Sequence, residues 1–297
     1  MIIDAHTHIL SQRRLDGLSI WLGQVFPHHP LAGKPFTVDF VIKDLLRKGV
    51  NYVFNLVFPM NPSETEELNL FSHHLSKNYD VVIPFGSLHI ENEDKRGIVH
   101  RCIKELGLFG FKLHPYVQGF SPDNEKMYPA YEIMEEFGTV INIHTGFEVA
   151  YPKRKVTITL ATIEKLVRKF SSLTFIISHM FYPRLDDAVY LLETYSNVYV
   201  DTTNIFSAIL QDERNGIGRD SEREILMDTL HKWSRRSVFG SDHPAGMSDI
   251  DTIFSDLNSF NLSHRTKSDI HFNTACNLVH HPSFTKKPPG PCLIDDE

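Results

Sequence analysis

The chain has 297 residues, of which 41% are hydrophobic, and a formal net charge of -7. This length suits one large domain, and the absence of a basic block in a negatively charged chain argues against nucleic acid as its main partner. No apolar run approaches the roughly 18 residues that a membrane-spanning helix needs, and no secretory segment precedes the first strand. With three scattered cysteines, we expect a cytoplasmic protein that does not bind membranes.

Short apolar runs alternate with amphipathic stretches along the chain. The first run ends in Asp4-Ala5-His6-Thr7-His8, and the glycines and prolines of residues 9–36 predict an irregular lid or pocket wall. Its candidate lining residues are Trp21, Phe26 and His28. Further strands are predicted at 51–58, 81–88, 108–114, 139–144, 173–179, 198–202 and 237–242. Helices are predicted at 37–48, 63–77, 94–106, 125–137, 159–170, 184–195, 221–235, 248–258 and 264–279.

Eight apolar strands, each followed by a helix, predict a parallel sheet closed into a (β/α)8 TIM barrel. We expect one domain over residues 1–281 and a poorly ordered tail over 282–297. An open doubly wound sheet is the alternative architecture. Such a sheet usually carries a glycine-rich phosphate turn after its first strand, where this chain has His6-Thr7-His8.

Polar side chains that could bind a metal or a substrate stand where the predicted strands end. The active site of a TIM barrel lies at the C-terminal ends of its strands. Residues two apart in a strand share one face, so neighbouring ligands there point the same way. A buried polar group without a partner costs about 1–3 kcal/mol, so core packing does not explain so many of them. These strand-end residues are His6, His8, Lys112, His114, His144, His179, Asp201 and Asp242.

Five motifs resemble those of the amidohydrolase superfamily, most closely its amidohydrolase-related metal-dependent hydrolases, a branch that also includes decarboxylases. The motifs are Asp4-Ala5-His6-Thr7-His8, Gly110-Phe111-Lys112-Leu113-His114-Pro115, Ile143-His144-Thr145-Gly146, Ser178-His179-Met180 and Gly240-Ser241-Asp242-His243-Pro244. The resemblance runs from residue 2 to about residue 280 and implies a divalent metal, usually zinc, at the barrel mouth. The resemblance further implies that His6, His8, His144 and Asp242 bind the metal. It implies that His179 is an acid/base residue or a ligand of a second metal.

These residue types suit a hydrolase. Three neutral imidazoles and one carboxylate leave a divalent ion with positive charge, and a water bound to such an ion can have a pKa near about 7. Asp242 would accept the proton of that water, and His179 would polarise the substrate carbonyl. We therefore expect cleavage of a C–N or C–O bond in an amide, lactone or ester of a small organic substrate. A metal-dependent, non-oxidative decarboxylase or lyase is the second hypothesis, and a non-catalytic metal-binding barrel is the third.

Cationic groups near the mouth would suit a substrate that carries a carboxylate. Lys112, His114 and Arg154 are the candidate substrate-binding residues. A lysine ammonium beside a divalent ion would be repelled by it, which favours one ion with Lys112 as a substrate or neighbouring cation. The alternative is a carboxylated Lys112 that bridges two ions, with His179 as a further ligand. We also expect a homo-oligomer that associates through helices outside the mouth.

Overall fold

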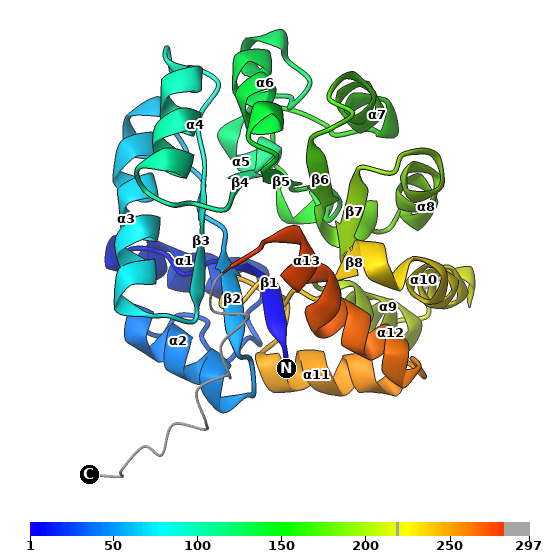
Figure 1. The fold of residues 1–297 in the computed structure, drawn as a ribbon. Coiled ribbons are helices and arrows are strands. Elements are labelled where there is room, and N and C mark those ends of the chain that lie inside the picture. Colours follow the sequence, from blue (N-terminus) through cyan, green and yellow to red (C-terminus); the bar gives the residue numbers. More distant parts are fainter. Residues whose placement is uncertain (218–219, 282–297) are drawn as a thin grey trace.

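A computed structural model describes residues 1–217 and 220–281 of the chain. Eight parallel strands form one sheet in which strands that follow one another in sequence are also neighbours in space (Figure 1). The (β/α)8 TIM barrel predicted from the sequence is confirmed. The strands are β1 (Ile3–Thr7), β2 (Tyr52–Asn55), β3 (Val82–Gly86), β4 (Gly110–Leu113), β5 (Val140–Ile143), β6 (Thr174–Ile177), β7 (Val198–Asp201) and β8 (Ser237–Val238).

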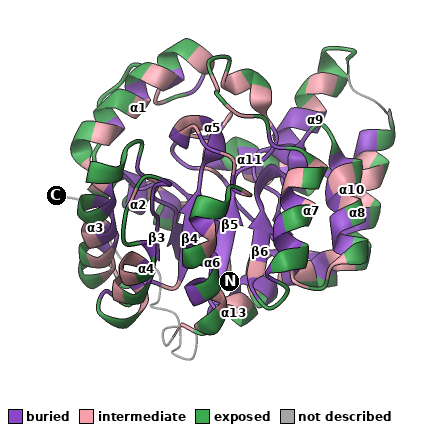
Figure 2. Ribbon diagram, turned by 90° about the horizontal axis from the view of Figure 1, so that it is seen from above, coloured by how far each residue is buried: buried purple, intermediate pink, exposed green. Residues whose placement is uncertain are grey.

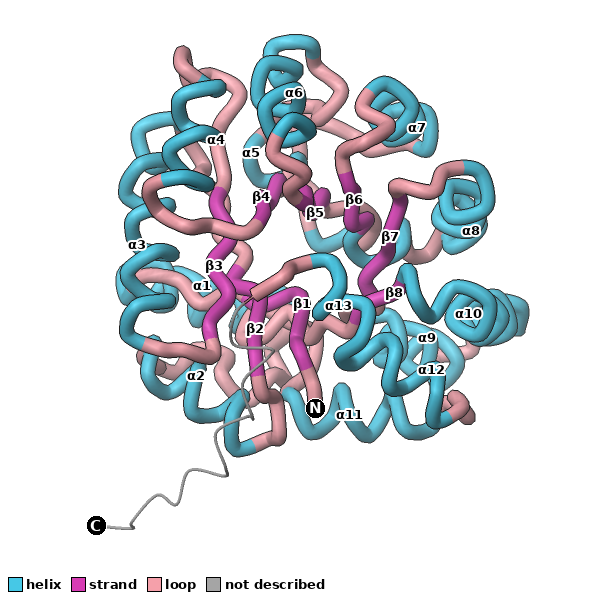
Figure 3. The backbone as a smooth tube through the Cα atoms, in the orientation of Figure 1, coloured by secondary structure: helices cyan, strands magenta, loops and turns pink. Residues whose placement is uncertain are grey.

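Helices surround the ring of strands (Figure 3). The strands are buried, while the helices expose their outer faces (Figure 2). None of the described helices is long and apolar enough to cross a membrane. The helices are α1 (Gln12–Val25), α2 (Val38–Arg47), α3 (Thr65–Asn78), α4 (Lys95–Lys104), α5 (Pro115–Gln118), α6 (Tyr128–Glu136), α7 (Leu160–Lys169), α8 (Leu185–Thr194), α9 (Ile205–Arg214), α10 (Asp220–Trp233), α11 (Ile250–Ser259), α12 (His264–Ser268) and α13 (Thr274–Leu278).

The seam between the first strand and the end of the eighth is held by backbone hydrogen bonds. The amide of Ala5 donates to the carbonyl of Phe239 at 2.8 Å, and the amide of Asp242 donates to the carbonyl of His6 at 2.8 Å. The predicted strand over 237–242 is therefore too long, because only its first two residues form β8. Residues beyond β8 turn toward β1 instead, and this turn brings Asp242 beside His6.

Side-chain parity in β4 confirms the direction predicted for its polar residues. Phe111 and Leu113 are fully buried in the apolar layer between strands and helices. Lys112 lies between them in sequence and points into the barrel, where its ammonium donates to the Oδ1 of Asn142 at 2.6 Å. Asn142 is also the register partner of Lys112 across the β4–β5 ladder. The barrel interior at this level is thus polar.

The prediction of an irregular segment over residues 9–36 is wrong, because α1 occupies its first half. One face of this helix is buried. Its buried residues are spaced by four and three, as helical periodicity requires, and they are Leu15, Ser19 and Leu22. Gly17 and Gly23 are the residues of this helix that favour an irregular segment. Each glycine costs a helix only about 1 kcal/mol, and burial of this face outweighs that cost.

Three other predicted segments also differ from the structure. Residues 203–217 and 115–124 lie outside the predicted strands and helices, yet they contain α9 and α5, respectively. The helix predicted over 264–279 is interrupted by a π-helical turn at Asp269–Asn273. The tail over 282–297, predicted to be poorly ordered, lies outside the described residues.

Candidate metal centre and active site

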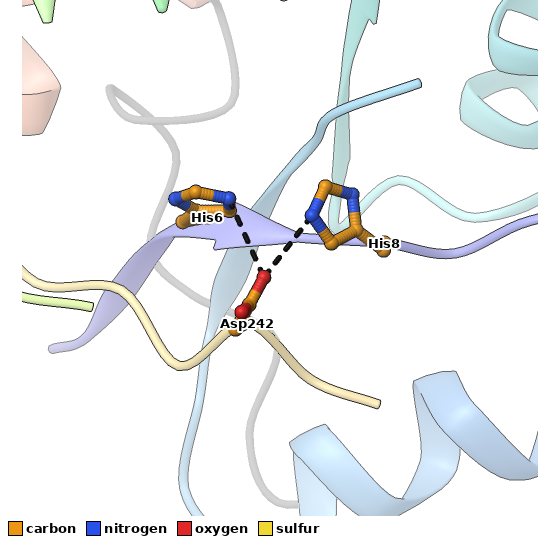
Figure 4. Close-up of side chains that lie close together, drawn as sticks. All are labelled: His6, His8 and Asp242. Atoms are coloured by element: carbon orange, nitrogen blue, oxygen red, sulfur yellow. Dashed lines mark ion pairs between the residues drawn. The ribbon is translucent and has the colours of Figure 1, made fainter. Parts of the chain in front are cut away.

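Three of the predicted metal ligands converge on one point at the end of the strands (Figure 4). The Nε2 atoms of His6 and His8 lie 3.5 Å and 3.1 Å from the same oxygen, Oδ1 of Asp242. One ligand atom from each residue lies within 4.8 Å of the others. We call these three residues the triad.

The far nitrogens of the triad histidines are held by oxygen atoms. Nδ1 of His6 lies 2.9 Å from Oδ2 of Asp201, and Nδ1 of His8 lies 2.7 Å from the carbonyl of Leu56. Both oxygens accept, so each ring carries a proton on Nδ1 and turns Nε2 toward Oδ1 of Asp242. Burial, followed by the charge of Lys112, lowers the pKa of His6 to about 3. Imidazoles that are held in this way are suited to bind a metal through Nε2.

The carboxylate of the triad is fixed from its other side. Asp242 follows β8 with a left-handed backbone (φ 65°), a conformation that costs a non-glycine residue roughly 1–3 kcal/mol. The amide of Asn204 donates to its Oδ2 at 2.9 Å, which leaves Oδ1 toward the histidines. Burial alone would raise the pKa of Asp242, but the hydrogen bond from His8 and the nearby histidines hold it well below its usual range. The donor set of two imidazoles and one carboxylate therefore fits a divalent metal.

A second group of rings lies next to the triad. His179 connects the two groups, because its ring centroid lies 5.0 Å from that of His6 and its Nε2 lies 3.2 Å from Nδ1 of His144. His144 stacks on His114 with ring centroids 3.8 Å apart, and Nε2 of His114 lies 3.1 Å from the hydroxyl of Tyr151. Burial is the largest cause that lowers the pKa values of His144 and His114 well below the usual range. Both rings are therefore neutral at pH 7.

Lys112 lies beneath the triad with no exposed surface. Its ammonium is 3.3 Å from Nε2 of His6, the nitrogen that also faces the carboxylate of the triad. It donates to Oδ1 of Asn142 at 2.6 Å and to the hydroxyl of Ser178 at 3.0 Å. Burial lowers the pKa of Lys112 to about 8. The charge of Lys112 therefore lies close enough to act on any ion held between the residues of the triad.

Close packing behind His6 requires a residue without a side chain. A Cβ at Gly240 would lie 2.1 Å from the hydroxyl of Thr203 and 2.7 Å from Cβ of His6. Asp4 lies on the same seam, where its Oδ1 accepts hydrogen bonds from the amides of His6 at 3.1 Å and Ser241 at 3.0 Å. Burial raises the pKa of Asp4 to about 7. The first motif thus joins the two chain segments that carry the triad.

A cavity of about 400 Å³ opens above the triad. Its floor contains His8, Asp242, His114 and His144, so both groups of rings reach it. Figure 2 shows α1 and α5 at this end of the strands and the N-terminus at the other. The remaining lining residues are largely apolar, and five of them belong to α1. Those from α1 are Arg13, Arg14, Gly17, Leu18 and Trp21, and the others are Leu10, Phe58, Met60, Val117, Tyr151 and Ala245.

Some predicted site residues lie outside the triad or outside the cavity wall. His144 lines the cavity but is not part of the triad, and neither Lys112 nor Arg154 lines the wall. Arg154 instead forms an ion pair with Glu148 at 3.0 Å. Of the predicted lid residues, Trp21 lines the cavity. Phe26 does not line it and instead packs edge-on against the ring of Trp21.

Sequence reasoning found some of the residues that position the site and missed others. Asp201 was named among the strand-end residues, but its role as the partner of His6 was not predicted, because that contact depends on the closed barrel. Asn204 and Tyr151 lie in loops, where no spacing rule marks them. Tyr151 reaches the cavity only because its loop folds back over the second group of rings.

Fold and site together define a TIM-barrel protein whose strands carry, at their C-terminal ends, a triad that could hold a metal ion. The chain matches the family described as amidohydrolase over residues 3–252. It belongs to that family, as its motifs indicated. No protein among those with curated descriptions matches the sequence.

Solved structures similar to this chain share the fold at low sequence identity. An uncharacterised TIM-barrel protein from Bordetella bronchiseptica has a TM-score of 0.71 and 17% identity, over 93% of this chain and 97% of that one. A proposed 2-pyrone-4,6-dicarboxylic acid hydrolase from Pseudomonas putida has a TM-score of 0.62 and 18% identity, over 93% and 96%. A dihydroxybenzoic acid decarboxylase from Polaromonas, with bound manganese and the inhibitor 2-nitroresorcinol, has a TM-score of 0.67 and 15% identity, over 93% and 96%. Both hydrolytic and decarboxylating enzymes thus occur among proteins of this fold.

Proposed function

We propose that this protein is a metal-dependent enzyme that acts on a small organic acid or its ester, lactone or amide. The observation that carries this proposal is the triad, whose two Nε2 atoms and one carboxylate oxygen meet at the floor of a cavity. Zinc suits two imidazoles and a carboxylate, and manganese is the ion of the Polaromonas decarboxylase. His144 is the proposed fourth ligand, because its buried Nε2 has no protein partner among the described residues.

The chain's own groups supply the remaining chemistry. When bound, the ion would act as a Lewis acid toward a substrate oxygen and lower the pKa of a water ligand. Asp242 is ionised at neutral pH, so its carboxylate can accept a proton. His179 lies between the two groups of rings. Its Nδ1 donates to the carbonyl of Thr203, so the neutral ring can accept a proton at Nε2, and the imidazolium that forms can donate to a developing oxyanion. The apolar wall excludes water from the reacting bond.

Hydrolysis of a C–N or C–O bond is the first proposed reaction. Decarboxylation is the second, and it is favoured by the aromatic part of the wall, since Trp21, Phe58 and Tyr151 offer flat surfaces to an aromatic acid. The two reactions make different demands on the same site. Hydrolysis needs a proton acceptor for water, whereas decarboxylation needs a proton donor for the carbon that loses CO2.

The test compares zinc-loaded, manganese-loaded and metal-free protein on two substrate panels. Esters, lactones and amides are followed by acid release, and aromatic and unsaturated acids by CO2 release. We expect metal-dependent acid release that is lost in Asp242→Asn. CO2 release without hydrolysis would support the second reaction, and inactivity of metal-replete protein on both panels would contradict the proposal.

A further inference from the structure

The face that α1 turns to the cavity has a pattern of its own. Arg13, Gly17 and Trp21 all line the cavity and follow one another at a spacing of four residues. Residues four apart on a helix lie on the same side. The cavity side of α1 therefore presents a cation, a gap and a flat ring in succession.

The two arginines of this helix differ in their partners. Arg14 donates to the carbonyl of Phe58 at 2.8 Å and pairs with Glu64 at 2.6 Å, so its charge is satisfied within the protein. Arg13 forms no hydrogen bond or ion pair with any residue that the structure describes, and its side chain is exposed. Arg13 is thus the cation of the cavity wall that remains available to an external anion.

The gap at Gly17 is not required by the backbone. A Cβ built there meets no atom within 4 Å, and its φ is in the ordinary helical range. Glycine is among the least favourable residues in a helix interior, and alanine would stabilise this position. What glycine gives instead is open volume on the cavity side of α1.

We propose that α1 determines substrate specificity, with Arg13 binding an anionic group of the substrate at the opposite end from the reacting group. The apolar body of the substrate passes over Gly17, between α1 and the wall formed by Phe58 and Val117. The substrate class is therefore an elongated, flat acid with an anion remote from the triad. This inference rests on the proposed function only in taking the cavity as the substrate site.

The test measures binding by calorimetry to full-length, metal-loaded protein. The probes are benzene-1,4-, naphthalene-2,6- and biphenyl-4,4'-dicarboxylate, each beside its monocarboxylate. We expect at least one dicarboxylate to bind at least tenfold more tightly than its monocarboxylate, because one carboxylate reaches the triad and the other reaches Arg13. Arg13→Gln should abolish this preference, while Arg168→Gln, an exposed arginine of α7 away from the cavity, should leave it unchanged.

The gap is tested by filling it. Gly17→Leu should raise or keep the melting temperature and weaken binding of the preferred dicarboxylate at least tenfold. Gly23→Ala is the matched control, because this glycine of α1 does not line the cavity and its added Cβ would make only an ordinary contact with Gly33 at 3.6 Å. It should bind the probe as the wild type does.

The outcomes separate this inference from the proposed function. Equal affinity for mono- and dicarboxylates, no binding of any probe, or unchanged binding in both Arg13→Gln and Gly17→Leu would overturn the inference, even for an active enzyme. A dicarboxylate preference that depends on both residues supports it, even if the metal-loaded protein turns over no substrate.

Discussion

The rings of the site fall into two groups that differ in how their nitrogens are satisfied. In the triad, His6 and His8 each hold Nδ1 against an oxygen and direct Nε2 to one point. In the second group, Nδ1 of His114 and Nε2 of His144 are buried without a protein partner among the described residues. An unpaired buried polar atom costs about 1–3 kcal/mol. The nitrogens of the triad are thus oriented within the protein, whereas the second group leaves two buried nitrogens open, one of which is Nε2 of His144, the proposed fourth metal ligand.

The largest effect is expected when both triad histidines are removed. His6→Ala combined with His8→Ala should lower metal affinity more than about 10³-fold, because only the carboxylate remains of the preformed ligand set. Elemental analysis after gel filtration should find essentially no metal in the double variant.

His114→Ala is the control from the second group and should keep the metal content of the wild type. An unchanged metal content in the double variant would contradict the assignment of the triad.

A smaller effect is expected from the group behind the triad. Asp201→Asn removes the charge that accepts from Nδ1 of His6 and should weaken metal binding about 10–100-fold, as losses of such partners do. The variant is isosteric, so circular dichroism should confirm that it folds. Competition with a chelator of known affinity measures the change, and wild-type affinity would show that the triad needs no support from Asp201.

The sequence predicted the triad better than its surroundings for a physical reason. His6 and His8 lie at the end of the first strand and Asp242 follows the last, and barrel closure brings such ends together whatever the loops do. Arg154 was predicted at the cavity on its charge and position after β5, yet a local ion pair with Glu148 holds it. Loop geometry of this kind depends on contacts between irregular segments, which no periodicity in the sequence records.

The same limit applies to α1. Its buried stripe was present in the sequence, but glycines at two positions suggested an irregular segment. Whether such a segment forms a helix depends on the surface that buries Leu15 and Leu22, and that surface exists only in the assembled barrel. The Trp21 prediction succeeded because Trp21 lies on the face of α1 that is turned to the cavity, whereas Phe26, at the end of this helix, packs against the ring of Trp21 instead.

A change in the second group of rings should lower turnover and leave metal affinity nearly unchanged. Tyr151→Phe removes the hydroxyl that lies 3.1 Å from Nε2 of His114. We expect metal affinity to stay within about twofold and kcat/KM to fall about tenfold, since one lost hydrogen bond is worth about 1 kcal/mol or slightly more. Metal titration and steady-state kinetics on the same preparation provide the comparison. A loss of metal affinity equal to that of Asp201→Asn would remove the distinction between the two groups.

The smallest effect concerns Lys112, which lies between the two groups and carries the charge least compatible with a metal. Its ammonium is 3.3 Å from Nε2 of His6, so a divalent ion at the triad would be repelled by it. Because the pKa of Lys112 is lowered to about 8, the neutral fraction of its amine rises about fivefold between pH 7 and pH 8. If the proton must leave before metal binds, metal affinity should rise about fivefold over this interval.

Lys112→Met should remove most of this pH dependence while keeping one metal per chain. Stability of the metal-free protein gives an independent check of the sign. The folded state releases its proton near pH 8 and the unfolded chain near pH 10.5, so the unfolded state binds more protons between these values and stability rises with pH there. Urea unfolding of the wild type at pH 8 and pH 9.5 should show this rise, and the methionine variant should not. Two metals per chain that depend on added bicarbonate and on Lys112 would contradict a single ion and show instead that the lysine is carboxylated, since a carbamate supplies an anionic bridge where the ammonium repels.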